Sequence, residues 1–445
     1  MNIKRLYRWL GTFIKMIIKP FYLIIFRKTL RLISVTGGTT NIRDLLTALK
    51  IILNHKNWQK GHNIRKLERM FMEYLGVRYA VSFNGARVGL RAILEAMDIG
   101  NGDEVILPGY TCVVVPNALL YRGIYPVYVD IDLETFTFTI DQLQKSLTQK
   151  TRAIVLQYNY GLIPDNLSDV VELAQKHGVK VIEDCAAALG ASYRGQKVGT
   201  FGDAAIFSTE QTKCISTQFG GMAVTNDFYL GEKLTQIQSS LRFPSKNQIK
   251  LRLFQFIFNY FNFHPVLSIW FKDIASMIRS LFGLQIQNMN IQELSCVEPA
   301  DHNVRMPNAM ATLGIRQMEY IDQYANHRRF IAGIYNQILK THLKVTQQSN
   351  DIQNAYLRYP ILVLQNRDKI LKKTYQCGIQ LGEWFNNVIH PCGVPLDKLK
   401  YIHGSCPQAE KVAGKVLNLP THPSVSEKDA KRIACIILKA IDEPD

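Results

Sequence analysis

Hydrophobic and polar positions between residues 60 and 230 alternate between two patterns. Amphipathic stretches with a helical period predict helices over 63–75, 85–96 and 166–177. The segments between them contain short apolar runs, which predict buried strands over 79–82, 104–107, 126–130, 153–157 and 179–183. Strands that are apolar on both faces and alternate with helices indicate a mainly parallel sheet covered on both sides. An α/β fold is therefore predicted for this part of the chain.

The remainder of the body predicts a second, smaller unit. Helical patterns cover 309–339, 367–377 and 426–441, and a strand pattern covers 355–363. We therefore expect a large domain over 55–305 and a small α+β domain over 306–445. Ligands of open parallel sheets bind at the carboxyl ends of the strands, so the residues after each predicted strand are the first candidates for a site.

The N-terminal segment, residues 1–45, differs from both units. On a helical wheel, the bases of 3–26 lie on one side, and apolar residues, several of them aromatic, lie on the other. This pattern is typical of a helix in a membrane interface, and packing on the protein body or on a partner subunit is the alternative. Lys15, Lys19 and Pro20 interrupt the apolar run, which argues against a membrane-spanning helix.

An aromatic-rich insertion is expected within the large domain, over residues 251–287. Its aromatic run is too short to cross a bilayer and is broken at His264-Pro265. A helical hairpin in the core is the favoured interpretation. A second patch that meets lipid beside 3–26 is the other, and the pattern does not separate the two.

Charge is concentrated at the N-terminus. The chain has 53 basic and 36 acidic residues, a net charge of +17, but nine bases precede the first acid, Asp44. The rest has 44 bases against 36 acids, or +8, which argues against a nucleic-acid-binding surface. The eight cysteines show no metal-ligand spacing and suit a reducing compartment. We therefore expect no metal site and a cytoplasmic location, at the inner face of the membrane if 3–26 binds lipid.

Two predicted strand ends carry candidate chemistry. Asp184 follows an apolar strand, where its carboxylate could hold a cationic ring nitrogen or merely cap the next helix. Ser208 ends a further strand and could donate to a phosphate, and Lys213 follows it in a loop. A lysine among apolar and hydroxyl groups can form a Schiff base with a carbonyl, whereas most loop lysines are simply solvated.

A third candidate is the turn of Gly85, Ala86 and Arg87 between a predicted strand and a helix. Backbone N–H groups at the start of a helix bind anions. Glycine is common in such turns, so this signal is weak when taken alone. The Arg87 guanidinium could serve as an additional phosphate ligand.

The order and spacing of these candidates resemble the DegT-type (DegT/StrS) sugar aminotransferases. These are pyridoxal-phosphate enzymes with the aspartate-aminotransferase fold (fold type I). The resemblance covers roughly residues 55–440 and implies a large, mainly parallel α/β domain with a smaller C-terminal domain. The segments that carry it, besides the candidates above, are 102–108, 126–132, 181–184, 199–205, 303–306 and 417–423.

The resemblance implies a role for each candidate. Lys213 would bind pyridoxal 5′-phosphate as a Schiff base and move a proton, and Asp184 would keep the pyridine nitrogen protonated. Ser208 and the backbone of 85–87 would hold the phosphate. Asn303 would reach the cofactor phosphate of the partner subunit, which implies a homodimer.

The resemblance also implies the substrates. Glutamate would be the amino donor, and a keto group on a nucleotide-linked sugar would be the acceptor, in polysaccharide or amino-sugar biosynthesis. Tyr110 and His390 are candidate substrate contacts. The ring-stacking position, often aromatic, is Cys112 here, and the position three after Asp184 is Ala187 instead of Gln or His.

Two other functions stay open on the sequence alone. A sugar dehydratase branch of the same fold replaces the Schiff-base lysine with histidine, and Lys213 argues against it. A non-catalytic relative that binds a sugar nucleotide or a partner protein is kept open by Ala187 and Cys112.

Overall fold

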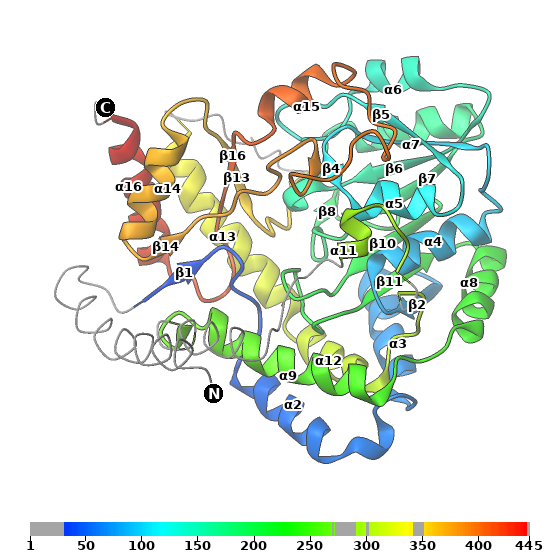
Figure 1. The fold of residues 1–445 in the computed structure, drawn as a ribbon, viewed down its shortest axis with the longest axis horizontal. Helices are drawn as coiled ribbons and strands as arrows, with labels where there is room; N and C mark the ends of the chain where they lie inside the picture. The colour runs from blue at the N-terminus through cyan, green and yellow to red at the C-terminus, as the bar shows by residue number, and fades with distance from the viewer. Residues whose placement is uncertain (1–30, 269–270, 272–290, 300–301, 341–350, 443–445) are drawn as a thin grey trace, which may run out of the picture.

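The computed structural model describes residues 31–268, 271, 291–299, 302–340 and 351–442. A seven-stranded sheet covered by helices lies at one end of the molecule. At the other end, α13 (Ile321–Leu339), α14 (Arg367–Gln376) and α16 (Glu427–Asp442) gather beside a two-stranded sheet (Figure 1). The segment 3–26 lies outside the described residues, and no described helix is long and apolar enough to cross a bilayer.

The large sheet confirms the predicted α/β class. Its strands lie in the order β2-β11-β10-β7-β6-β3-β5, and β11 is antiparallel to both of its neighbours, whereas the other neighbouring pairs are parallel. The strands are β2 (Tyr79–Phe83), β3 (Glu104–Pro108), β5 (Tyr125–Val129), β6 (Thr151–Gln157), β7 (Lys180–Asp184), β10 (Ala204–Ser208) and β11 (Gly221–Thr225).

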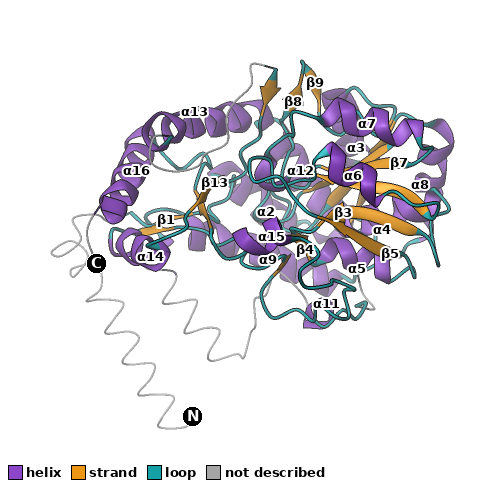
Figure 2. Cartoon of the chain, turned by 90° about the horizontal axis from the view of Figure 1, so that it is seen from above, coloured by secondary structure: helices purple, strands orange, loops and turns teal. Residues whose placement is uncertain are grey.

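Helices cover both faces of this sheet (Figure 2). Successive residues of a strand point to opposite faces, so Ile154 and Leu156 join one core while Ala153 and Val155 join another. The first core includes α3 (Asn63–Leu75), α7 (Leu167–Lys176) and α12 (Asn308–Met318). The second includes α4 (Ala86–Ala96), α5 (Val114–Leu120) and α8 (Phe228–Ser240). Double coverage explains why the central residues of these strands are apolar on both faces.

The predicted single helix over 309–339 is wrong, because the chain forms α12 and α13 with a break at Glu319 and Tyr320. Tyr320 has φ −114° and ψ 6°, outside the helical region. The two helices face different cores: α12 packs on α3, and α13 packs on α16. A helical period continues on either side of the break, so the pattern alone conceals it.

The rest of the small end is built from short pieces. β13 (Tyr359–Leu362) pairs antiparallel with β16 (Val416–Leu419), so the strand predicted over 355–363 is shorter than expected. Near the N-terminus, β1 (Ile33–Ser34) pairs with β14 (Ile379–Gln380), which ties residues before the large domain to the small one. The proposed domain boundaries stay a prediction.

Two helices pack together beside the large sheet. α2 (Ile42–Leu53) begins at Asn41, whose side chain caps the helix together with Asp44. α9 (Lys246–Phe263) begins at a similar capping box and packs against α2. The first part of the aromatic-rich insertion is therefore a helix packed on the body, and 272–287 lies outside the described residues.

Candidate active site

The predicted candidates gather at one edge of the large sheet. In the strand register, Asp184 lies opposite Ile206 on β10, so β7 and β10 end side by side. Gly221 at the start of β11 lies between Ser208 and Phe83. The ends of β7, β10 and β2 therefore bring Asp184, Ser208 and the turn after Phe83 to the same edge.

Asp184 is buried and held in place by two donors. Its Oδ2 accepts a hydrogen bond from Gln157 Nε2 at 2.8 Å, and its Oδ1 accepts from the backbone N–H of Ala186 at 3.0 Å. The preceding acid, Glu183, points to the opposite face, where the Tyr158 hydroxyl donates to it at 2.6 Å. Of the two adjacent acids, only Asp184 belongs to the candidate site.

The start of α4 has the features of an anion site. Gly85 is its N-cap residue and gives no side-chain cap, so the first N–H groups of this 11-residue helix have no capping partner from that position. A Cβ at Gly221 would lie 2.3 Å from the Ala86 nitrogen, so only glycine permits this close approach. The buried Ser208 lies across Gly221 in the register.

Arg87 and Asn303 lie beside this helix start with partners from their own chain. The Arg87 guanidinium pairs with Glu293, a buried residue of α11 (Ile291–Leu294). Asn303 Nδ2 donates to Glu298 Oε1 at 2.7 Å. A cavity of about 20 Å³ is lined in part by these four residues. The role of the Arg87 guanidinium as a phosphate ligand stays a prediction. A bound phosphate would compete with the Glu293 carboxylate for this guanidinium.

Lys213 lies in the loop after β10. A backbone hydrogen bond from the Thr209 N–H to the Gly220 carbonyl closes the loop, and Lys213 Nζ lies 4.8 Å from the ring centroid of Trp384. Burial raises the pKa of the Cys112 thiol, and the charge of Lys213 opposes part of that rise. Lys213 therefore lies beside Trp384, and its charge acts on the Cys112 thiol. The ring-stacking position of Cys112 stays a prediction.

Arg358 approaches the same indole and was missed by the sequence analysis. Its Cζ lies 4.1 Å from the Trp384 ring centroid, and its Nη1 makes a long contact of 3.5 Å with Asn418 Oδ1. Burial lowers the pKa of Arg358 to about 10, so it stays charged at neutral pH. The signal available in the sequence was a single arginine inside the apolar strand pattern over 355–363.

His390 is placed beside these groups. It lies on β15 (Ile389–His390), which pairs with β4 (Thr111–Cys112) so that His390 lies opposite Cys112. Its Nδ1 lies 2.9 Å from Asn386 Oδ1. Burial, reinforced by the charges of Arg358 and Lys213, lowers the pKa of His390 to about 3. The ring is therefore neutral at physiological pH.

Tyr110 does not belong to the open part of the site. It has no exposed surface, stacks on Phe136, and its hydroxyl lies 3.0 Å from the Tyr160 hydroxyl and 3.1 Å from the Phe385 carbonyl oxygen. A side chain enclosed on all sides has no surface to offer a substrate. The expectation of a substrate contact is corrected to a packing role.

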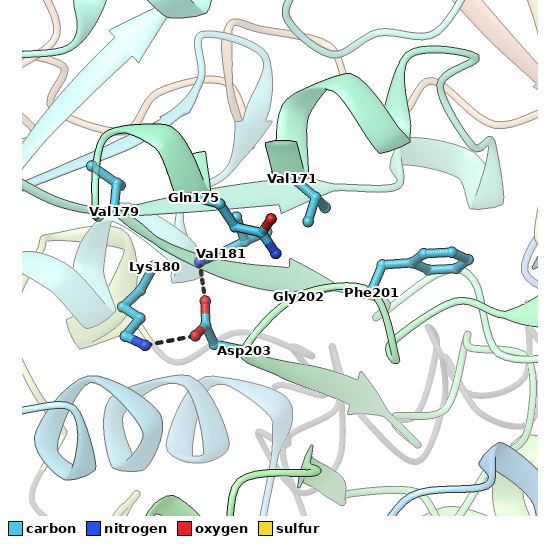
Figure 3. A pocket seen from close by; sticks show the side chains of 9 residues that line it. Val171, Gln175, Val179, Lys180, Val181, Phe201, Gly202 and Asp203 are labelled. Atoms are coloured by element: carbon cyan, nitrogen blue, oxygen red, sulfur yellow. Dashed lines mark hydrogen bonds and ion pairs between the residues drawn. The ribbon is translucent and has the colours of Figure 1, made fainter. Parts of the chain in front are cut away.

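A larger hollow lies at the opposite edge of the sheet. Figure 3 shows it between the start of β7 and the segment before β10, with Lys180 and Asp203 among the lining side chains. Its volume is about 330 Å³, and Asp203 accepts hydrogen bonds from Lys180 Nζ at 2.7 Å and from the Val181 N–H at 2.9 Å. These charges are already paired, and ligands of parallel sheets bind at the other edge.

The arrangement of the sheet and its strand ends is the fold of the fold type I aminotransferases, and solved structures agree. An aminotransferase involved in pseudoaminic acid biosynthesis from Helicobacter pylori superposes with a TM-score of 0.72 at 23% identity, covering 92% of this chain and 99% of the other. An aminotransferase from Brucella abortus has a TM-score of 0.70 at 21% identity, covering 90% and 96%. These likenesses confirm the predicted fold.

The chain belongs to the DegT/DnrJ/EryC1/StrS aminotransferase family, which matches residues 40–256 and 272–438. It is 31% identical to GDP-perosamine synthase of Escherichia coli O157:H7 over 371 residues, 83% of this chain and 87% of the relative. It is 28% identical to a UDP-N-acetyl-3-dehydro-alpha-D-glucosamine 3-aminotransferase of Acidithiobacillus ferrooxidans, covering 89% and 94%. Aminotransferases of this family depend on pyridoxal phosphate in general, so the predicted enzyme class is confirmed.

Proposed function

We propose that this aminotransferase uses pyridoxal 5′-phosphate to transfer an amino group, from glutamate, to a keto group of a nucleotide-linked sugar. The names of the relatives support a nucleotide sugar as the acceptor, since they include a GDP-linked and a UDP-linked compound. The proposal is carried by one observation: Asp184, Ser208 and the start of α4 lie together at the ends of adjacent strands.

The residues at the edge of the sheet fit the cofactor. The uncapped N–H groups at the start of α4 and the Ser208 hydroxyl suit a phosphate, and Gly221 leaves room beside them. Asp184, fixed by Gln157 and Ala186, suits a protonated ring nitrogen. Lys213 Nζ would bind the carbonyl carbon of the cofactor.

Pyridoxal phosphate, when bound, supplies an electron sink that stabilises negative charge on the substrate carbon bearing nitrogen. The chain would contribute positioning and proton transfer. Lys213 Nζ, once released from the cofactor, would take the proton from that carbon and deliver it to the C4′ carbon of the cofactor. His390, neutral because its pKa is lowered to about 3, adds no positive charge beside that amine.

The test is a visible absorption spectrum of the purified protein with pyridoxal phosphate, before and after glutamate is added. We expect a band of lysine-bound cofactor that disappears with glutamate. Lys213→Ala should lack that band, and Lys233→Ala, which removes a surface lysine paired with Asp98, should behave as wild type. No band in the wild-type protein would favour the non-catalytic alternative, and a band unchanged by glutamate would exclude glutamate as donor.

A further inference from the structure

Helix α2 is apolar on both of its sides. Leu45 and Ala48 are buried against the body of the protein. The opposite side exposes four large apolar side chains, with exposed fractions between 43% and 83%: Ile42, Leu46, Leu49 and Leu53. These positions recur with the period of a helix, so they form one stripe along α2. A helix with apolar residues on both sides is normally covered on both, which points to an occupant outside the described chain.

Helix α9, which packs beside α2, leaves a second apolar stripe exposed. Its buried side includes Ile249 and Leu253, whereas Leu251 and Phe254 are 54% and 49% exposed. Figure 1 shows the two helices together at the lower edge of the molecule. Exposed apolar patches on soluble proteins mark interaction sites. We define the α2–α9 face by its six exposed apolar side chains: Ile42, Leu46, Leu49, Leu53, Leu251 and Phe254.

The charged residues exposed on these two helices are all basic. Helix α9 contains no acidic residue. The single acid of α2, Asp44, is buried and accepts a hydrogen bond from Gln317 Nε2 at 2.7 Å, so it presents no charge at the surface. The exposed bases are Arg43, Lys50, Lys246 and Lys250. Apolar side chains flanked by bases are typical of helices that lie in the interface of an anionic membrane.

The N-terminal segment joins the described chain at the end of α9. The Leu32 N–H donates to the Pro265 carbonyl at 2.8 Å, and Pro265 follows the last residues of α9 closely. Nine bases precede the first acid of the chain, Asp44, and the pattern of 3–26 is basic and amphipathic. Clustered bases are drawn to anionic lipid. The most basic part of the sequence is therefore attached next to the α2–α9 face.

We propose that the α2–α9 face binds the surface of a membrane that contains anionic lipids, with its apolar side chains in the interface and its lysines at the headgroups. The contact is peripheral, since no helix in the described part of the chain is long and apolar enough to cross a bilayer. This inference goes beyond the function proposed above and does not depend on it.

Two other occupants would suit the apolar side chains but not the charges. In a symmetric dimer, a patch meets its own copy, and bases such as Lys50 and Lys250 would then meet a surface whose two helices offer no exposed acid. The segment 3–26 also has bases and no acid, so covering the face with it would add positive charge to positive charge. An anionic lipid surface complements both the apolar and the basic residues.

The experiment measures sedimentation of the full chain with lipid vesicles. Vesicles that mix phosphatidylcholine with phosphatidylglycerol are negatively charged, and vesicles of phosphatidylcholine alone are not, so wild-type protein should prefer the mixed vesicles. Leu46→Gln combined with Leu53→Gln should lower the partition coefficient at least about 10-fold, because two apolar side chains no longer leave water. The matched control, Leu364→Gln combined with Ile402→Gln, changes two similarly exposed side chains outside α2 and α9 and should bind as wild type.

A pair of lysine variants tests the charge. Lys50→Gln combined with Lys250→Gln should weaken binding to the mixed vesicles roughly 5-fold for each lysine and leave binding to phosphatidylcholine alone unchanged. Lys150→Gln combined with Lys411→Gln alters the net charge equally at exposed positions outside the two helices, and it should bind both kinds of vesicle as wild type. Added salt should weaken the binding of wild-type protein to the mixed vesicles.

Contrary results would each name another explanation. Wild-type protein with no preference for the mixed vesicles would overturn the proposal. A leucine variant that binds them as strongly as wild type would overturn it too, because the lipid contact would then lie elsewhere on the chain. Loss of the oligomeric state of that variant in light scattering would assign the face to a second copy. A protein that binds the vesicles but does not react with glutamate would contradict the proposed function alone.

Discussion

Burial sets the protonation of two histidines, His390 at the candidate site and His422 beside Ser34. The pKa of His390 is lowered to about 3, and that of the fully buried His422 is lowered to about 4, in both cases chiefly by burial. In the unfolded chain, both would titrate near the ordinary value of about 6.5. Between these pH values, the unfolded state binds protons that the folded state does not, so folding stability falls as the pH decreases.

We expect the contribution of these two histidines to the wild-type free energy of unfolding to be constant above about pH 7 and to fall below about pH 6.5. His390→Asn should lose less stability between pH 7 and pH 5 than wild type, because it removes one group that takes up a proton only on unfolding. Urea denaturation at each pH measures this. His177→Asn, at an exposed position, is the control, and equal pH slopes for His390→Asn and wild type would contradict the expectation.

Two glycines form a matched pair for testing the packing around His422. A Cβ at Gly37 would lie 2.2 Å from His422 Nε2, whereas a Cβ at Gly333 on α13 would have no atom within 4 Å. Gly37→Ala should therefore destabilise the protein by at least about 1–3 kcal/mol through overpacking. Gly333→Ala should stabilise it by up to about 1 kcal/mol, because alanine favours the helix. Thermal denaturation of both variants measures the difference in sign.

The sequence predicted the candidate site residues at strand ends, but it did not predict the residues that the small end of the chain brings beside them. Asp184, Ser208 and Lys213 were predictable because strand ends of a parallel sheet share one edge. Arg358 and Trp384 come from the small end of the chain, and only the folded arrangement places both beside Lys213. The ion pair of Arg87 with Glu293 was unpredictable for the same reason, because the two residues are far apart in the sequence.

At the scale of elements, α2 has two faces of different kinds. Its inward face includes the buried Leu45 and Ala48, which pack on the body. Its outward face exposes four large apolar side chains at helical spacing: Ile42, Leu46, Leu49 and Leu53. The sequence pattern could not separate these faces, because leucine occurs on both.

The exposed face of α2 should contribute little to folding. Leu46→Gln combined with Leu53→Gln should change the free energy of unfolding by no more than about 0.5 kcal/mol per site, since both side chains are exposed. Leu45→Ala should cost about 2–5 kcal/mol, because it leaves a cavity in the core. Urea denaturation compares the variants, and a large loss in the double variant would mean that this face is covered in the folded protein.

Element boundaries were predicted well where a strand or helix faces one core. The range predicted for α3 agrees with the structure at both ends, and α14 differs by one residue. The break between α12 and α13 was missed because no glycine or proline stands at Glu319 and Tyr320. That break arises from packing against two different neighbours, which local sequence does not encode.

At the scale of the whole molecule, the proposed homodimer makes a prediction about shared sites. Asn303 would serve the partner's cofactor, and Lys213 would serve the cofactor of its own chain. Each of Lys213→Ala and Asn303→Ala should then lower activity on its own. When the two variants are unfolded together and refolded as a mixture, hybrid dimers should contain one intact site, and activity should return.

The mixing experiment has a clear contrary result. If Asn303 serves its own chain, where it lies beside Glu298 and the start of α4, no combination of the two variants makes an intact site. Activity would then stay at the level of the single variants. Each variant mixed only with itself is the control, and light scattering establishes whether the protein is dimeric.

The indole of Trp384 has a consequence for watching the enzyme at work. The chain has four tryptophans, and Trp384 lies beside both the amine of Lys213 and the guanidinium of Arg358. Emission from an indole depends on the charges beside it, so filling the site should alter the fluorescence of this one ring. The protein thus carries its own optical reporter of occupancy, and Trp384→Phe would silence that reporter while leaving the other three tryptophans as an internal reference.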